Sequence, residues 1–195
     1  SLNLPAATTA NNLLQNSPNL TSLTINAPLV TNFYNAIQGT PITTLNGNLS
    51  SLANFELPAS IISIDIDLSS VVDGEALIKY ATKIESIKGS LSSVTSFGKR
   101  SLPSTTLKTF EANLSSLKTG DMLFYNCSKM TSFKPTSLNK LETGVDMFYS
   151  CTGMESWRWE LDMKKLTDGT RMFKDCSTLQ YVNSHMGDLE TATDM

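Results

Sequence analysis

The sequence predicts a solenoid of the α/β repeat class, in which short coils stack along one axis and each adds one strand to a parallel sheet. Two observations predict it. A phrase containing Phe-x-x-Cys returns as MLFYNCSKM (122–130), MFYSCTGM (147–154) and MFKDCSTL (172–179), and its cysteines are 24 and 25 residues apart. In addition, pairs of apolar residues recur at similar intervals along the whole chain. A period in this range is typical of repeat architectures.

The apolar pairs define about eight repeats of 19 to 25 residues, with starts near 20, 42, 61, 84, 107, 130, 154 and 179. We expect residues 1–195 to form one array. We also expect this array to be a piece of a longer chain, because both ends of the sequence stop inside a repeat and neither carries the polar capping repeat that solenoid ends normally need. The pairs are Leu20/Leu23, Ile42/Leu45, Ile61/Ile64, Ile84/Ile87, Leu107/Phe110, Met130/Phe133, Met154/Trp157 and Leu179/Val182.

Each repeat reads as a strand, a turn and a variable outer segment. Apolar and polar residues alternate from Ile62 to Asp67, which favours a short half-buried strand at the first pair. The polar residue that ends this segment predicts a turn, because such side chains bond to nearby backbone. In successive repeats this residue is Asn48, Asp67, Ser90 and Asn113.

The outer segments are of two kinds. Repeats with the Phe-x-x-Cys phrase have room for a short helical turn on the outer side. The repeats containing FELPASI (55–61) and FGKRSLPSTTL (97–107) predict tighter loops, because proline disfavours continuing a helix. A single coil cannot bury its own apolar edge, but stacked coils can. The expected fold is therefore a right-handed solenoid with one parallel sheet of about eight short strands.

Composition and charge exclude several classes of function. The formal net charge is -3 and the isoelectric point is about 5.1, and basic residues occur in pairs such as Lys99–Arg100. This pattern argues against a nucleic-acid partner, which requires dense basic runs. No apolar stretch approaches the roughly 18–20 residues that span a bilayer, so direct membrane insertion is not expected. No targeting segment is visible at the start of the sequence.

The cysteines and tryptophans are expected to be structural. Cys127, Cys151 and Cys176 occupy one repeat position, where small buried thiols suit a core. Redox pairing and metal binding are the alternatives, although a column along the axis does not bring three or four ligands to one point. Trp157 and Trp159 fall on apolar strand positions and are expected in the core.

The repeat phrases resemble a known family. MFYSCTGMESW, MFKDCSTLQYV and the LPASIISI and LPSTTLKTF variants are similar to leucine-rich repeats, and among them to the BspA-like (Treponema-type) repeats of bacterial surface proteins. The resemblance covers nearly the whole chain. It implies adhesion, host-surface interaction or coaggregation, and an extracellular, cell-surface or virion-surface location.

An enzyme is not expected, and neither is a cofactor or a metal. His185 is the single histidine and falls in a predicted turn, and no nucleophile can be assigned beside it. Asp65, Asp67, Asp73 and Glu75 partly match a calcium loop, but their spacing misses the pattern that brings oxygens together. Acids of a solvated strand and turn are the preferred interpretation.

The remaining candidate site is the outward face of the sheet. The residues between and just after each first apolar pair should point outward, and the middle one is Ser or Thr in seven of eight repeats. Hydroxyl packing between strands explains that column without a ligand. The outer columns become charged and then aromatic, which favours a partner, an unknown protein or glycan on a host or microbial surface. The candidate partner-binding residues are Glu85, Lys88, Lys108, Glu111, Lys134, Glu155, Arg158 and Tyr181.

Two functional classes remain open at this point. The first is a non-enzymatic binding or adhesion module that uses the strand face. The second is a passive spacer or stalk in a larger surface protein or a virion fibre. The hydroxyl-rich, weakly charged repeats from Thr21 to Ser63 favour the spacer, and the charged and aromatic repeats from Glu85 to Tyr181 favour the binding module.

Overall fold

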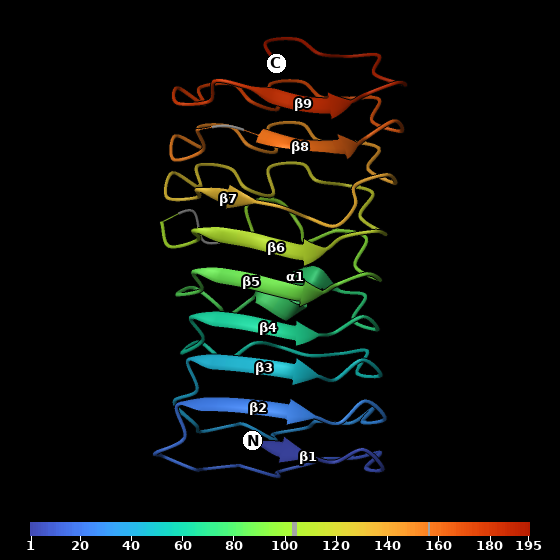
Figure 1. The fold of residues 1–195 in the computed structure, drawn as a ribbon. Helices are drawn as coiled ribbons and strands as arrows, with labels where there is room; N and C mark the ends of the chain where they lie inside the picture. Colours follow the sequence, from blue (N-terminus) through green and yellow to red (C-terminus); the bar gives the residue numbers. More distant parts are fainter. Residues whose placement is uncertain (103–104, 156) are drawn as a thin grey trace.

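The computed structural model describes residues 1–102, 105–155 and 157–195, with backbone alone for residues 157–160. These ranges form nine short strands and one helix, arranged as a stack of coils (Figure 1). In chain order they are β1 (Leu2–Asn3), β2 (Ser22–Asn26), β3 (Thr44–Asn48), β4 (Ser63–Asp67), α1 (Gly74–Ile78), β5 (Ser86–Ser90), β6 (Thr109–Asn113), β7 (Ser132–Phe133), β8 (Trp157–Asp162) and β9 (Val182–His185).

The strands pair in sequence order, all parallel, which confirms the predicted solenoid. Strands β1 to β7 form one sheet, and each residue faces its equivalent one coil later. From β2 to β7 the second residue of each apolar pair occupies the second position of its strand, in the series Leu23, Leu45, Ile64, Ile87, Phe110 and Phe133. In β8 and β9 the corresponding residues, Trp157 and Val182, are the first of the strand. The apolar pairs therefore located the strands correctly.

We predicted one continuous sheet of about eight strands. The strands instead form two sheets, because β8 and β9 pair separately from β1 to β7. The N–H groups of Lys134 and Thr136 donate backward to Phe110 and Ala112, at 2.8 and 3.4 Å. The backbone of the intervening Pro135 therefore faces the coil that contains β8. Proline has no N–H to donate there, and a sheet tolerates proline at an edge or an interruption.

Apolar side chains from every coil form one continuous core. From β2 to β6 the second and fourth residues of each strand are on the core side, as Leu23 and Ile25 are. The rings of Phe124 and Phe148 stack with centroids 5.2 Å apart, and Phe148 and Phe173 continue the stack at 5.4 Å. The Phe-x-x-Cys phrase thus fills the same part of the core in successive coils.

Two glycines occupy the fourth position of alternate strands. Gly47 and Gly89 have φ values of +118° and +96°, in the region that favours glycine. A Cβ atom at either residue would overlap the backbone carbonyl of the preceding coil, at Ile25 and Ile66. The column therefore alternates isoleucine with glycine from β2 to β5 and ends with Ala112 in β6.

The outer segments of the Phe-x-x-Cys repeats are hydrogen-bonded turns, so the expected helical turns are not formed there. In the coil of residues 121–127, the N–H groups of Met122, Phe124 and Asn126 donate to carbonyls of the next coil at 2.8 to 2.9 Å. A helix would instead direct these donors along its own axis. These turns contain left-handed residues, many of them the Asn and Asp that tolerate this conformation: Met122, Asn126, Asp146, Ser150, Arg171 and Asp175. Turns of the first coils, which lack the phrase, contain Asn12, Asn16 and Asn35 in the same conformation.

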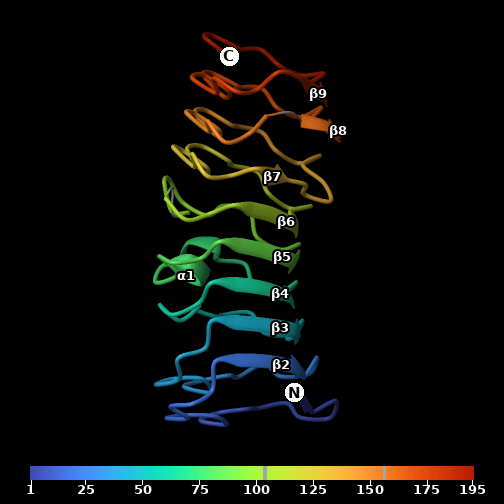
Figure 2. The same ribbon diagram turned by 60° about the vertical axis from the view of Figure 1, so that its left-hand side comes forward.

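The single helix of the described chain, α1, lies on the outer side of a coil without the cysteine phrase (Figure 2). Asp73 caps its first turn by accepting a hydrogen bond from the N–H of Ala76 at 2.9 Å. Leu77 and Ile78 are buried. The FELPASI segment forms a loop without helix, as expected, whereas residues 103–104 of the second Leu-Pro segment lie outside the described residues.

The cysteines are unpaired and line the core, which confirms the predicted buried thiols for Cys127 and Cys151. Cys176, in the last coil, is half-buried. The thiols of Cys151 and Cys176 donate to the carbonyls of Phe124 and Phe148 in the preceding coil, at 3.1 and 3.0 Å. Burial raises the pKa of Cys127 to about 12 and also raises the pKa of the other two thiols.

Candidate functional site

The outward side of β2 to β7, with the residue before each strand, forms what we call the strand face. It lies along one side of the stack, and the outer turns and α1 lie along the other (Figure 2). All its side chains are exposed or half-buried, as predicted. It has three columns: Thr21, Thr43, Ile62, Glu85, Lys108 and Thr131; Ser22, Thr44, Ser63, Ser86, Thr109 and Ser132; and Thr24, Asn46, Asp65, Lys88, Glu111 and Lys134.

Four of the eight candidate residues form two ion pairs between neighbouring coils. The Lys108 ammonium lies 2.7 Å from the Glu85 carboxylate, in the first column. The Lys88 ammonium lies 3.0 Å from the Glu111 carboxylate, in the third column. In the first column the acid belongs to the coil of β5 and the base to the coil of β6, and in the third column this order is reversed. Each of the two coils therefore carries one acid and one base of these pairs.

The Glu111 carboxylate accepts hydrogen bonds from two neighbouring coils of the strand face. The hydrogen bond from Lys88 is the largest cause that lowers its pKa, and a second bond, from the Ser132 hydroxyl at 2.8 Å, acts in the same direction. This carboxylate is thus held by β5 and β7 together. It fixes the arrangement of charges across three coils.

The other four candidate residues lie in later coils. Lys134 follows β7. Glu155 is exposed, and its backbone carbonyl accepts a hydrogen bond from the N–H of Gln180 at 2.8 Å. Tyr181 precedes β9 and is 56% exposed. Arg158 belongs to β8, but its side chain lies outside the described residues, as do those of Trp157 and Trp159, whose predicted burial remains untested.

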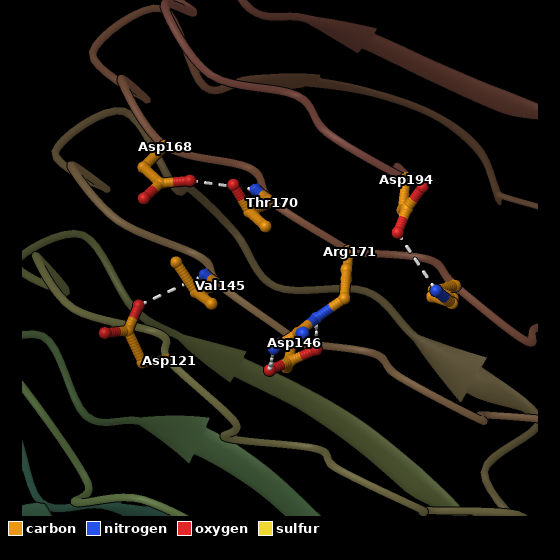
Figure 3. A network of polar contacts seen from close by, with 8 residues as sticks. Asp121, Val145, Asp146, Asp168, Thr170, Arg171 and Asp194 are labelled. Atoms are coloured by element: carbon orange, nitrogen blue, oxygen red, sulfur yellow. Dashed lines mark hydrogen bonds and ion pairs between the residues drawn. The ribbon is translucent and has the colours of Figure 1, made fainter.

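A second polar network lies on the outer side and was not predicted (Figure 3). Arg171 donates two hydrogen bonds to the carboxylate of Asp146, at 2.8 and 2.6 Å, and the Asp146 side chain is almost fully buried. Asp121 accepts the N–H of Val145 at 3.1 Å, and Lys174 bonds Asp194 at 3.0 Å. Each of these contacts joins one coil to the next.

Aromatic side chains extend this outer network. The rings of Tyr125 and Tyr149 stack with centroids 4.8 Å apart, and the guanidinium of Arg100 lies 4.2 Å from the Tyr125 centroid. The Tyr149 hydroxyl bonds to Asp175, which raises its pKa. One face of the Tyr125 ring contacts a guanidinium and the other a ring, so this cluster holds coils together and does not offer an open platform.

The outer contacts have a sequence signal that could have identified them. Asp146 and Arg171 occupy the same repeat position one coil apart, because the Asp146 N–H donates to Thr170, just before Arg171. Tyr125 and Tyr149 are related in the same way. Comparing equal repeat positions on the outer side would have placed these residues side by side.

The residues considered for catalysis or metal binding each contact a nearby residue or cap a local element. His185 ends β9, where a turn was predicted, and its Nδ1 atom lies 3.8 Å from an oxygen of Asp162. Asp67 accepts the N–H of Ser69, and Asp73 caps α1. Across the described residues, no group of three or more His, Cys, Asp or Glu side chains is placed to hold a metal ion.

The predicted turn residues also have defined partners. The side chains of Asn48, Asp67 and Asn113 each accept the backbone N–H two residues later, at 2.9 to 3.0 Å.

In the part of the chain that the structure describes, no helix has the length and apolar character needed to cross a bilayer.

Comparison with known proteins identifies one family. A family model described as the BspA type leucine rich repeat region matches residues 74–188 in six copies. This range runs from α1 into the coil that follows β9 and contains all eight candidate residues. No curated protein and no solved structure matches the chain.

Proposed function

The chain belongs to the BspA-type leucine-rich repeat family, and from this premise we propose that it is a surface-exposed, non-enzymatic binding module that recognises a protein or a glycan through its strand face. Repeats of this family suggest an interaction or adhesion role, and proteins that carry them are typically surface-associated. Fold alone does not define function. The proposal therefore depends on the strand face.

The observation that carries the proposal is the organisation of that face. Six successive strand-face coils place their side chains in three straight columns, so a partner meets hydroxyl, amide and charged groups at a regular spacing. Burial, by contrast, is concentrated on the opposite side of the same strands, where Leu45, Ile64 and Ile87 enter the core. The sheet can therefore vary its outward residues without changing its packing.

The test compares two arginine variants that both place bulk on the surface. The face variant combines Thr44→Arg and Ser86→Arg in the hydroxyl column. The control combines Thr31→Arg and Thr95→Arg, exposed residues that directly follow the buried Val30 and Val94 on another side of each coil. Labelled parent and variants are incubated with cultured epithelial cells and with bacterial cells, and bound protein is measured by flow cytometry.

We expect the parent and the control to bind at least one cell type and the face variant to lose that binding. All three proteins must first show the same circular dichroism spectrum and thermal midpoint. Equal binding by the face variant and the control, or no binding by the parent, would favour the spacer function instead.

A further inference from the structure

We propose that the ligand of the strand face is an uncharged polysaccharide chain that lies along the solenoid axis and contacts several coils at once. This inference rests on the proposed binding function and goes further by naming the chemical class of the partner. It follows from the balance of charge, the kind of hydrogen-bonding groups and the shape of the face.

The charges of the strand face compensate one another. Its three columns carry three acids and three bases, and Asp67 at the end of β4 adds one further acid. The six residues of the columns are Asp65, Glu85, Glu111, Lys88, Lys108 and Lys134. Four of these form the two cross-coil ion pairs at 2.7 and 3.0 Å. An acidic polymer would need an uncompensated basic stripe, since release of counterions drives its binding. A strongly basic partner would need the reverse, and both would have to break existing pairs.

The uncharged groups of the face suit the hydroxyls of a sugar. The middle column presents one Ser or Thr hydroxyl in each of six coils, and each hydroxyl can donate one hydrogen bond and accept two. Their mutual bonds leave capacity unused, as in the long 3.4 Å contact between Ser63 and Thr44. Thr24 and Asn46 add hydroxyl and amide groups in the third column. A neutral saccharide offers alternating hydroxyl donors and acceptors to such a surface.

The shape of the face favours a long chain over a small molecule. A hollow among the described residues of the last coils is lined by residues such as Phe173, Cys176 and Met195 and contains no strand-face residue. Each coil contributes one residue to each column, and six strands at about 4.8 Å spacing span about 24 Å. A linear polymer can thus repeat the same weak contact from coil to coil, and binding strengthens with the number of units.

Apolar groups extend the same surface at two points. Ile62 is 39% exposed in the first column, between Thr43 and Glu85. Tyr181 lies in a later coil beside the exposed Gln180 and is 56% exposed. A tyrosine ring combines an apolar body with a polar hydroxyl, which matches the C–H face and the hydroxyl edge of a pyranose.

The first experiment measures direct binding of the whole chain to defined polysaccharides. The probes are oligosaccharide series from a neutral β-glucan and a neutral mannan, from dimer to dodecamer, with heparin and polygalacturonate as polyanions. We expect affinity for one neutral series to rise at least about tenfold with chain length. Raising sodium chloride from about 0.1 to 0.5 M should change that affinity less than about twofold.

Matched variants locate the binding. Thr44→Arg with Ser86→Arg should abolish it, whereas Thr31→Arg with Thr95→Arg should not. All variants are first checked for the parent's thermal midpoint.

Treatment of the cell surface covers neutral glycans outside these series. Periodate cleaves vicinal diols of glycans, and protease removes proteins. Cell binding that depends on the strand face should be lost after periodate and kept after mild proteolysis. Binding that survives periodate and matches neither neutral series, or that switches to a polyanion with strong salt dependence, would overturn the polysaccharide inference and leave the binding function standing. Absence of any face-dependent binding to cells or probes would overturn both.

Discussion

At the residue scale, Cys127, Cys151 and Cys176 show how one repeat position combines similar packing with different exposure. All three are free thiols on the core side of the phrase, but only Cys176 is half-buried. Burial raises each pKa, so a buried thiol at this position stays protonated at ordinary pH and lacks the reactive thiolate.

Thiol labelling tests this difference. At pH 8, iodoacetamide should modify Cys176 first, whereas Cys127 and Cys151 should react only after unfolding, because they are shielded and protonated. Mass spectrometry of tryptic peptides, with a urea-unfolded sample as the control, measures the order. Equally fast labelling of Cys127 in the native protein would contradict the buried position.

A single glycine tests the close approach of two strands. Gly47→Ala should lower the free energy of unfolding by about 2–4 kcal/mol, because its positive φ disfavours a side chain and its Cβ would overlap the carbonyl of Ile25. Urea denaturation measures the change. Gly187→Ala is the matched control: its Cβ meets no atom closer than 3.4 Å, and we expect a change within about 0.5 kcal/mol.

At the element scale, the inward residues were predictable and the outer segments were not. The strand positions follow from the pairs led by Leu20 and Ile42, since a half-buried strand alternates its apolar residues. The turns at 121–127 and 145–151 depend on hydrogen bonds to the next coil and on left-handed residues such as Met122 and Asp146. Neither feature has an apolar period, so a helical turn was the nearest expectation.

In the candidate site, the position of the residues was predictable from the sequence and their ion pairing was not. The columns of the strand face follow from strand alternation, which is why Glu85, Lys88, Lys108 and Glu111 were placed on one surface. Their pairing depends on the register between coils, which brings Lys88 opposite Glu111. The sequence carries this register only through the spacing of equal positions, and the shift between Trp157 and Leu161 shows that it can change within one pair of strands.

The buried carboxylate of Asp146 gives a test at this scale. Arg171→Gln should lower the urea midpoint, because it leaves a buried charge without its two hydrogen bonds. Adding Asp146→Asn should restore part of the loss by removing that charge. Lys174→Gln is the control. The ion pair of Lys174 with Asp194 is exposed, so we expect this substitution to leave the urea midpoint unchanged. Equal midpoints for Arg171→Gln and Lys174→Gln would show that the ion pair is not needed.

At the scale of the whole molecule, stability should vary along the stack. The seven-stranded sheet is regular from β2 to β6, whereas β8 and β9 pair separately with a shift of register between Trp157 and Leu161. Each coil contacts mainly its neighbours, so local opening is not shared equally.

Hydrogen exchange measures this variation directly. Amides of β3, β4 and β5 should exchange more slowly than those of β8 and β9, because they belong to an uninterrupted ladder with strands on both sides. Mass spectrometry of peptic fragments at neutral pH gives the order, with short labelling times to separate the coils. Faster exchange in β4 than in β9 would contradict the stability gradient.

The alternation of isoleucine and glycine has a consequence for how such arrays grow by gene duplication. Ile25 faces Gly47, and Ile66 faces Gly89, so each glycine leaves room for the backbone carbonyl of the coil before it. Copying a single coil would place either an isoleucine against such a carbonyl or two glycines side by side. Copying two coils would preserve every contact, so in this part of the array the heritable unit is the pair of coils.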